Sequence, residues 1–223
     1  MNLVVCINRP KNFSNFSFNC FFNMENNITK FGTVILAAGN SERMGTPKAL
    51  LKMASNHFFF ETLISNYQDA GISSIALVVQ NSLIKTIEKQ VQNLDGNIYI
   101  VVNNEPEKGR MHSLQLGLKF MKNKAVFVHN IDNPFVSNGL LMQMITKLEP
   151  KTYVKPLYQN KGGHPVLLSE EIVNELLHVE ATKENYLKNA LKKHSQILLE
   201  TNEPEILLNL NTPDDYQSFF ETH

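Results

Sequence analysis

Short apolar runs alternate with helix-patterned segments from residue 32 onward, and this alternation most constrains the fold. The strand candidates are apolar on both faces, which is typical of parallel strands covered by helices on each side. Strands that alternate with helices in this way predict a parallel sheet with crossover helices. We therefore expect an α/β fold: a single Rossmann-like three-layer domain with a mostly parallel sheet.

The expected elements alternate strictly in the first half of the chain and less regularly in the second. Strands are expected at 33–37, 74–80, 98–103, 125–132, 152–158, 164–169 and 197–200. Helices are expected at 58–71, 83–94, 112–121, 137–148, 169–177, 185–193 and 212–220. No internal repeat and no linker divides the sequence, so we expect one domain over residues 31–223.

The first thirty residues differ from the rest, because they are rich in Asn and Phe and show no clear period. They lack the basic start and continuous apolar stretch of a signal peptide. We expect residues 1–30 to be a poorly ordered N-terminal extension. Cys6 and Cys20 both lie in this segment, so a disulfide framework is not expected to hold the fold, and we expect a reducing cytoplasm.

The balance of basic and acidic residues indicates which classes of binding partner to expect. The chain has 21 Lys and Arg residues against 21 Asp and Glu residues. A general nucleic-acid binder or membrane-surface binder would normally show a basic excess, so we expect neither partner. No apolar run approaches the roughly 20 residues needed to span a bilayer. Any positively charged site must therefore be local.

The loop after the first expected strand, LAAGNSERMGTPK at 36–48, combines small residues with two cations. Small residues let backbone N–H groups approach an anion closely, while Arg43 offers a planar fork and Lys48 a point charge. Ligands collect at the carboxyl ends of strands in such sheets. The loop lacks the Gly-Lys-Ser/Thr of a P-loop and the Gly-x-Gly-x-x-Gly of a dinucleotide site. The alternative is an ordinary surface loop with two solvated cations.

These thirteen residues resemble the signature Leu-Ala-Ala-Gly-x-Ser-x-Arg-Met-Gly-x-x-Lys of the MobA-like nucleotidyltransferase superfamily, and most closely its molybdenum cofactor cytidylyltransferases. The resemblance extends to about residue 220 and implies a fold of the nucleotide-diphospho-sugar transferase type. In that family the loop wraps a nucleoside triphosphate, and its arginine and lysine stabilise charge. The resemblance assigns catalytic roles to Arg43 and Lys48, and it assigns nucleotide binding to Leu36, Ala37, Ala38, Gly39, Arg43 and Lys48.

The segment NNEPEKGRMHSLQLGL at 103–118 follows the third strand and resembles the family's Asn-(five residues)-Gly-Met-x-Ser-Ser-Leu element. The resemblance adds Asn103, Gly109 and Ser113 to the nucleotide-binding set. Arg110 stands where the family often has methionine, and His112 where it often has serine, which leaves the nucleotide preference open. Without the resemblance, Asn103 is read as a turn former and Ser113 as a helix cap.

Asp132 lies at the carboxyl end of a very apolar expected strand, close in the predicted sheet to the first loop. A lone carboxylate suits Mg²⁺, which takes one or two protein oxygens together with phosphate oxygens and water. The Asp-x-Pro pattern at 132–134 is similar to the family's metal-binding motif, which makes Asp132 a catalytic and metal-binding candidate. A turn aspartate is the alternative.

Two later segments resemble parts of the family that shape the acceptor site and close the metal site. KGGHPVLL at 161–168 implies acceptor contacts for Gly163 and His164, and a tight turn with a solvated histidine is the alternative. Lys155, in the expected strand at 152–158, is assigned to an acceptor phosphate, with a solvated lysine as the alternative. NLNTPDDY at 209–216 has amides where the cytidylyl branch often has an aspartate. We assign Asn209 to the metal and Asn211 to the acceptor; an amide oxygen coordinates without charge, so the metal should bind more weakly.

The resemblance implies a Mg²⁺-dependent nucleotidyltransferase that moves a nucleotidyl group, CMP from CTP, onto a phosphorylated small molecule such as molybdopterin and releases pyrophosphate. It further implies transient contact with a molybdoenzyme or its chaperone. A sugar phosphate or another small phosphorylated alcohol is the alternative acceptor. A nucleotide-binding accessory protein without turnover is the alternative from another class, and a redox Rossmann protein is disfavoured by the missing glycines. CTP against GTP, the physiological acceptor and the oligomeric state stay open.

Overall fold

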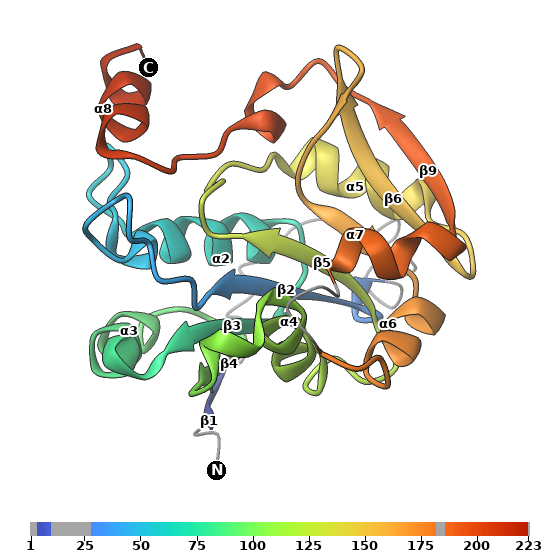
Figure 1. Cartoon of the computed structure of the whole chain (residues 1–223), viewed down its shortest axis with the longest axis horizontal. Helices are drawn as coiled ribbons and strands as arrows, with labels where there is room; N and C mark the ends of the chain where they lie inside the picture. Colours follow the sequence, from blue (N-terminus) through green and yellow to red (C-terminus); the bar gives the residue numbers. More distant parts are fainter. Residues whose placement is uncertain (1–3, 10–27, 182–185, 223) are drawn as a thin grey trace, which may run out of the picture.

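The computed structural model describes residues 4–9, 28–181 and 186–222, and Figure 1 shows the arrangement of the chain. A single sheet runs through the molecule in the order β1-β4-β3-β2-β5-β8-β6-β7, and β9 pairs with β6. The strands are β1 Val4–Arg9, β2 Phe31–Ala37, β3 Ser74–Gln80, β4 Gly96–Asn103, β5 Ala125–Asn130, β6 Thr152–Tyr158, β7 Lys161–Gly162, β8 Val166–Leu168 and β9 Ser195–Glu200.

Helices connect these strands and close the chain. The α-helices are α2 Phe59–Asp69, α3 Ile84–Val91, α4 Arg110–Leu118, α5 Asn138–Lys147, α6 Glu170–Leu176, α7 Leu187–Ala190 and α8 Pro213–Thr222. Short 3₁₀ turns are η1 Lys48–Leu50, η2 Asn81–Leu83, η3 Pro106–Lys108, η4 Leu191–Lys193 and η5 Pro204–Leu207. The helix expected at 185–193 is two shorter pieces, α7 and η4, and residue 185 lies outside the described residues.

The expected α/β domain with a mostly parallel sheet is confirmed. β2 pairs in parallel with β3 and β5, β3 pairs in parallel with β4, and β6 pairs in parallel with β9. β8 lies antiparallel between β5 and β6, and β1 and β7 are also antiparallel to their neighbours. The parallel half is therefore the region in which strands and helices alternate in the sequence.

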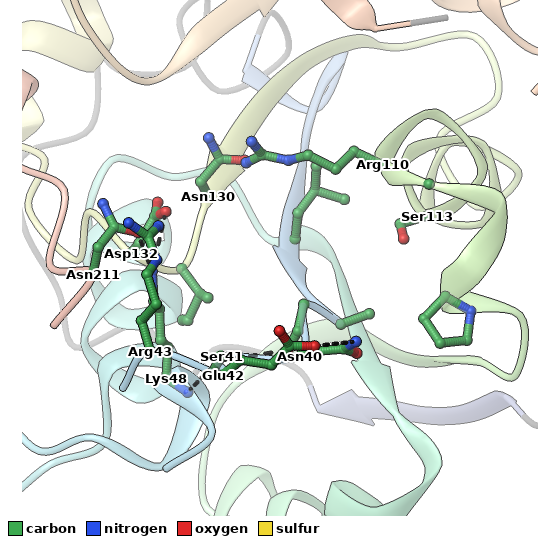
Figure 2. A pocket seen from close by; sticks show the side chains of 16 residues that line it. Asn40, Ser41, Glu42, Arg43, Lys48, Arg110, Ser113, Asn130, Asp132 and Asn211 are labelled. Carbon is green, nitrogen blue, oxygen red and sulfur yellow. Dashed lines mark hydrogen bonds and ion pairs between the residues drawn. The ribbon is translucent and has the colours of Figure 1, made fainter. Parts of the chain in front are cut away.

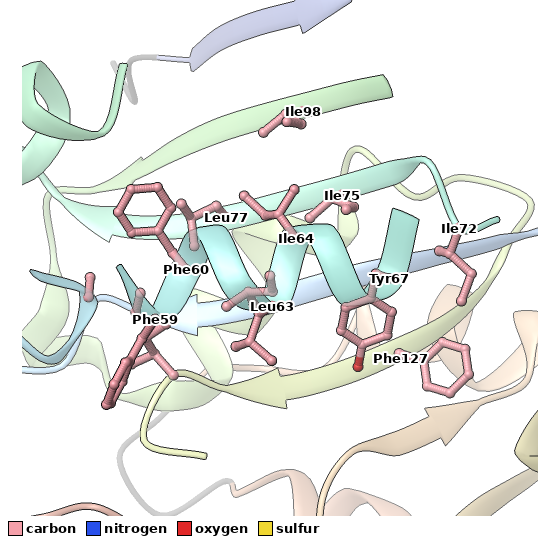
Figure 3. Close-up of a cluster of buried hydrophobic side chains, with 14 of the residues drawn as sticks. Phe59, Phe60, Leu63, Ile64, Tyr67, Ile72, Ile75, Leu77, Ile98 and Phe127 are labelled. Atoms are coloured by element: carbon pink, nitrogen blue, oxygen red, sulfur yellow. The ribbon is translucent and has the colours of Figure 1, made fainter. Parts of the chain in front are cut away.

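Helices cover both faces of the sheet and bury two apolar clusters. Residues of α2, α3, α5 and α8 pack with inward strand residues such as Ile35 and Leu77 on one face. Residues of α4 and α6 pack with Val34 and Val78 on the other face. Adjacent strand residues point to opposite faces, so the apolar runs supply both clusters at once. Figure 3 shows the packing of α2 over the sheet.

Local sequence signals mark where several helices begin and end. Ser137 caps α5, because its hydroxyl accepts a hydrogen bond from the backbone N–H of Leu140 at 3.0 Å. Gly71 follows α2 with a φ of 83°, a conformation that favours glycine after a helix. Asp214 and Asp215 lie in the first turn of α8, where the helix dipole favours acids.

The N-terminal segment differs from the expectation of a poorly ordered extension over residues 1–30. Val4–Arg9 forms β1, which pairs with the outer edge of β4 from Val4 opposite Val101 to Arg9 opposite Gly96. The strand completes the backbone hydrogen bonds of an edge that would otherwise be open. Val5 and Ile7 pack against the core, whereas Cys6 and Asn8 are exposed, so the strand alternates between its two faces. Residues 1–3 and 10–27 lie outside the described residues.

Candidate functional site

The loop between β2 and η1 is held in shape by its own polar groups and by a neighbouring strand. The backbone N–H of Lys48 donates to the Ser41 hydroxyl at 3.2 Å, which closes the loop across seven residues. Gln80, at the end of β3, donates from its amide to the carbonyl of Gly39 at 3.1 Å. Lys48 is therefore fixed at the start of η1, directly after Pro47.

A three-residue contact lies at the end of this loop (Figure 2). The Lys48 ammonium is 3.4 Å from the Asp132 carboxylate and donates to the Asn211 side-chain oxygen at 2.6 Å. The side chains of Lys48 and Asp132 are only 12% and 18% exposed, so the ion pair is poorly screened by water. The cation of the first loop and the lone acid thus converge as the sequence analysis predicts.

Strand pairing and hydrogen bonds from Leu210 and Asn133 explain this convergence. β2 and β5 are parallel neighbours, with Leu36 opposite Asn130, so the segments that follow them start at the same edge of the sheet. The C-terminal segment is tied to the same edge, because the backbone N–H of Leu210 donates to the Asp132 carbonyl at 2.8 Å. Buried Asn133 donates from its amide to the carbonyls of Glu205 and Ile206 at 3.1 Å each.

Asn211 is held in place by the start of α8. The Asp215 carboxylate accepts hydrogen bonds from the backbone N–H groups of Asn211 and Thr212 at 2.9 Å each. These bonds, the Asn211 N–H first, lower the pKa of Asp215 below its usual value. The capped helix start thereby sets the direction in which the Asn211 side chain leaves the backbone.

We call the cavity beside this contact the loop pocket; its volume is about 560 Å³. Figure 2 shows that residues from the first loop, from α4 and from the end of β5 surround it. Its lining comprises Leu36, Ala38, Gly39, Asn40, Ser41, Glu42, Arg43, Lys48, Pro106, Gly109, Arg110, Ser113, Asn130, Ile131, Asp132 and Asn211.

A second cavity of about 680 Å³ adjoins the first, and we call it the lysine pocket. It shares Leu36, Arg110 and Asn130 with the loop pocket, so the two form a continuous cleft. Its polar lining beyond the shared residues comprises Tyr153, Lys155, His164, Tyr186, Lys188, Lys192, His194 and Gln196. The described lining holds basic side chains and no carboxylate.

Residues 33–197 match the MobA-like NTP transferase domain, which is most of the chain. The chain belongs to the MobA-like NTP transferase family. Two relatives that align over most of their own length are named as nucleotidyltransferases of the molybdenum cofactor. Molybdenum cofactor cytidylyltransferase of Escherichia coli K12 is 24% identical over 183 residues, covering 82% of the chain and 92% of the relative. A probable molybdenum cofactor guanylyltransferase of Carboxydothermus hydrogenoformans is 26% identical over 197 residues, covering 84% and 93%.

Another relative is longer than the MobA-like protein. The bifunctional enzyme IspD/IspF of Bartonella henselae is 31% identical over 129 residues, which cover 56% of the chain and 32% of the relative. The matched part therefore spans about a third of that relative's length. The expected membership of the nucleotidyltransferase superfamily is confirmed by these findings together.

Solved structures share the fold at low sequence identity. Rv0371C of Mycobacterium tuberculosis, in a complex with manganese, gives a TM-score of 0.70 at 20% identity and covers 87% of the chain and 100% of its own. A nucleotidyl transferase from Methanothermobacter thermautotroptrophicus gives 0.70 at 19% identity, covering 87% and 99%. Within the described residues, no helix combines the length and apolar character that crossing a bilayer requires.

Most of the residues predicted to bind nucleotide line the loop pocket of the MobA-like protein, and two do not. Those in the lining are Leu36, Ala38, Gly39, Arg43, Lys48, Gly109 and Ser113. Ala37 instead packs in the core at 4% exposure, because successive strand residues face opposite sides. Asn103 is also buried and supports the wall, since its amide donates to the Ser113 hydroxyl at 2.9 Å.

The predicted metal ligands are placed differently from one another. Asp132 lines the loop pocket, and its Oδ1 atom is buried without a hydrogen-bond partner in the described chain. Asn209 is exposed and donates to the Leu207 carbonyl at 2.9 Å, away from Asp132. Asn211, by contrast, accepts a hydrogen bond from the Lys48 ammonium beside Asp132. The metal role of Asn209 stays a prediction.

The donor set fits a magnesium ion that is completed by substrate. No group of three or more His, Cys, Asp or Glu side chains gathers among the described residues. An all-protein cage is therefore not formed there. Mg²⁺ usually takes one or two carboxylates with phosphate oxygens and waters, which matches one acid with a free oxygen beside a pocket.

Of the predicted acceptor residues, Lys155 and His164 line the lysine pocket, and Asn211 lines the loop pocket. Gly163 lies outside both described linings. A side chain at Gly163 would collide with the carbonyl oxygen of Ile206, so this glycine allows close packing against η5. This close approach explains why a glycine stands at position 163.

Two histidines, His129 fully buried and His164 half-buried, lie near the end of β5. His129 is buried, accepts or donates a hydrogen bond with the Tyr67 hydroxyl at 2.9 Å, and has a pKa lowered to about 3 by burial. His164 is 3.1 Å from the Asn130 amide, and burial lowers its pKa to about 4. The Asp132 charge opposes this shift, and the charges of Arg110 and Lys155 add to it. Both imidazoles are therefore neutral at pH 7.

Sequence reasoning missed Asn130 and Arg110, which lie where the two pockets meet. A signal for Asn130 was present, because an amide ends an otherwise apolar strand two residues before Asp132. Arg110 appeared only as a departure from the family pattern. Ser41 was part of the first motif, and its role in holding Lys48 needed the loop conformation.

Proposed function

We propose that this protein is a Mg²⁺-dependent nucleotidyltransferase that moves CMP from CTP onto a phosphorylated small molecule of the molybdopterin type. The observation that carries the proposal is the meeting of Lys48, Asp132 and Asn211 in one wall of a cleft with two connected pockets. A nucleoside triphosphate fits the pocket with the cationic loop, and an acceptor fits its neighbour. CTP and the acceptor class are supported by the cytidylyltransferase relative, which covers most of both chains.

In the proposed reaction an oxygen of the acceptor phosphate attacks the α-phosphorus of the triphosphate. A new P–O bond forms while the bond to the bridging oxygen breaks, and pyrophosphate leaves with the electron pair. The chain supplies position and charge, since the two pockets hold the reactants end to end. Lys48 and Arg43 lie in the loop pocket and offset the negative charge that gathers on the leaving group.

Asp132 and Asn211 are the side chains that would hold magnesium. The metal, when bound, supplies Lewis-acid neutralisation of the phosphate oxygens. Ser41 keeps the Lys48 backbone in register, and the Asp215 carboxylate keeps Asn211 beside it. The chain thereby holds both charges of the site at fixed positions before substrate enters.

Melting temperatures with CTP, GTP, ATP and UTP, each with and without Mg²⁺, test the nucleotide. Stabilisation grows with the ratio of ligand concentration to dissociation constant, so the preferred base gives the largest shift. We expect CTP with Mg²⁺ to give that shift. A larger shift with GTP would contradict the CTP assignment and retain the reaction class.

A non-catalytic nucleotide-binding role is the second candidate, because an uncharged amide stands beside Asp132 at Asn211. Pyrophosphate release over a panel of phosphorylated acceptors separates the two. We expect release above the rate without acceptor for at least one molybdopterin-type or sugar-phosphate acceptor. Nucleotide binding with no release for any acceptor would favour the accessory role.

A further inference from the structure

Arg110 stands where the two pockets meet. It is the first residue of α4 and follows Gly109, whose φ of 89° is one that favours glycine. Arg110 lines both the loop pocket and the lysine pocket, a property it shares with Leu36 and Asn130. Figure 2 shows its side chain reaching from α4 toward Asn130 at the end of β5.

The Arg110 guanidinium is exposed and, among the described residues, has no hydrogen bond or ion pair with another side chain. Lys48 differs, because Asp132 and Asn211 already contact its ammonium. A guanidinium presents a planar fork of N–H donors that matches a phosphate group. At the junction this fork is available to a ligand.

The charge on each side of Arg110 indicates which ligand it meets. Acidic Glu42 and Asp132 line the loop pocket. The lysine pocket has no carboxylate in its described lining, and its cationic side chains are Arg110, Lys155, Lys188 and Lys192. A bound anion would therefore meet several cations and no repelling carboxylate on this side of Arg110.

The proposed reaction places one particular phosphate at this junction. The α-phosphorus of the nucleotide lies toward the loop pocket, and the body of the acceptor fills the lysine pocket. The attacking phosphate must lie between them, where Leu36, Arg110 and Asn130 form the shared wall. Of these side chains, only that of Arg110 is charged.

We propose that Arg110 binds the acceptor phosphate and orients its attacking oxygen; this rests on the proposed function. Two N–H groups of the fork bond the phosphate oxygens that do not attack. The third oxygen then faces the α-phosphorus, forms the new P–O bond and displaces pyrophosphate. The acceptor is thus a phosphomonoester, whose dianion attacks without giving up a proton.

Binding of phenyl phosphate to the nucleotide-loaded protein tests the proposal. The loop pocket is first filled with Mg²⁺ and the α,β-methylene analogue of the best-bound triphosphate, which cannot release pyrophosphate. Calorimetry then gives the dissociation constants of phenyl phosphate and of the nucleotide for wild type, Arg110→Met, Arg110→Lys and Lys108→Met. Lys108 is a matched control, because it is exposed, paired with Glu105 and outside both described linings.

We expect Arg110→Met to weaken phenyl phosphate roughly 10- to 100-fold, as the loss of charge-assisted hydrogen bonds predicts, and to change nucleotide affinity less than about twofold. Arg110→Lys should recover part of the affinity, since it keeps the charge without the fork. Lys108→Met should change neither constant. Melting temperatures of the variants check that the exposed substitutions leave the fold intact.

Three results would overturn the proposal while leaving the proposed function in place. The first is unchanged phenyl phosphate binding in Arg110→Met. The second is a loss of nucleotide affinity as large as the loss of phenyl phosphate affinity, which would assign Arg110 to the nucleotide. The third is a wild type that binds nucleotide without any phenyl phosphate. A wild type that binds no nucleoside triphosphate would instead remove the proposed function itself.

Discussion

The loop pocket and the lysine pocket lie side by side, yet their charges are arranged in opposite ways. In the loop pocket the central cation, Lys48, contacts an acid and an amide of the chain. In the lysine pocket, basic side chains face the cavity with no carboxylate in the described lining. The central cation of the first pocket is held by internal contacts, whereas the cations of the second have no carboxylate beside them in the described lining.

The two pockets are also formed by different kinds of secondary structure. Parallel strands β2 and β5 and their following segments build the loop pocket. Antiparallel β6 and β8 and the short α7 contribute to the wall of the lysine pocket. We infer that the loop pocket carries the steps common to the reaction class and that the lysine pocket carries acceptor selection.

The largest expected effect is on Lys48. Lys48→Ala removes the cation that offsets charge in the transition state, and turnover should fall about 10²- to 10³-fold in a pyrophosphate-release assay. Lys52→Ala is the matched control, because Lys52 is exposed, contacts Asn56 and lies outside both described linings. Full activity in Lys48→Ala would contradict the inference that the loop pocket carries the steps common to the reaction class.

His129 lies in β5 beneath the cleft and His164 lines the lysine pocket, and acid should act on both. The folded pKa values of His129, about 3, and His164, about 4, lie below the ordinary 6.5, so the unfolded chain binds protons more readily. The free energy of unfolding therefore falls as the pH drops below 6.5 toward these values.

Urea unfolding at pH 7 and pH 5 measures this loss. His129→Gln should reduce the difference between the two pH values by up to about 2 kcal/mol, which follows from about 1.4 kcal/mol per pH unit. His57→Gln replaces an exposed histidine and serves as the control. An equal pH dependence in wild type and His129→Gln would contradict the assignment of a neutral buried imidazole.

Asn211 and Asn209 offer a matched pair within one segment. Asn211→Ala removes the bond to Lys48, and turnover should fall roughly tenfold with a higher Mg²⁺ requirement, in line with one charge-assisted hydrogen bond. Asn209→Ala should leave both quantities unchanged, because that side chain contacts Leu207 instead. The reverse order of effects would return the metal role to Asn209.

The smallest effect is expected in the lysine pocket. Lys155→Met should raise the acceptor KM several-fold and leave the nucleotide KM unchanged, since a partly exposed single cation contributes about 1 kcal/mol. Lys161→Met, on exposed β7, is the control. A change in the nucleotide KM of the same size would show that the two pockets do not divide the substrates as inferred.

The parallel half of the fold was predictable because local pattern and tertiary role agree there. Runs such as 74–80 are apolar on both faces, and β3 occupies those residues. The antiparallel parts were harder, because β1 and β8 take their places from pairing partners distant in the sequence. The alternation in residues 4–9 spans only a few positions of an Asn- and Phe-rich segment, so the composition of the whole segment suggested an unstructured extension.

The residues of the candidate site likewise fall into some that the sequence predicted and some that only the structure revealed. Lys48 and Asp132 were predicted because each follows a buried strand with a recognisable motif, and adjacent parallel strands bring such ends together. The choice between Asn209 and Asn211 depends on the hydrogen bond from Leu210 to Asp132, which no motif encodes. Arg110 departs from the family pattern, so its place at the junction became visible only in three dimensions.

The contact between Lys48 and Asp132 also bears on the order in which ligands enter. Each side chain is the counterion of the other. A free metal ion can pair only with Asp132 and would leave Lys48 without a counterion, and a free triphosphate can pair only with Lys48 and would leave Asp132 without one. A magnesium–nucleotide complex carries both signs and can exchange with both partners in one event. Entry as a preformed chelate is therefore the route that leaves neither side chain without a counterion, and binding of the two components should be strongly synergistic.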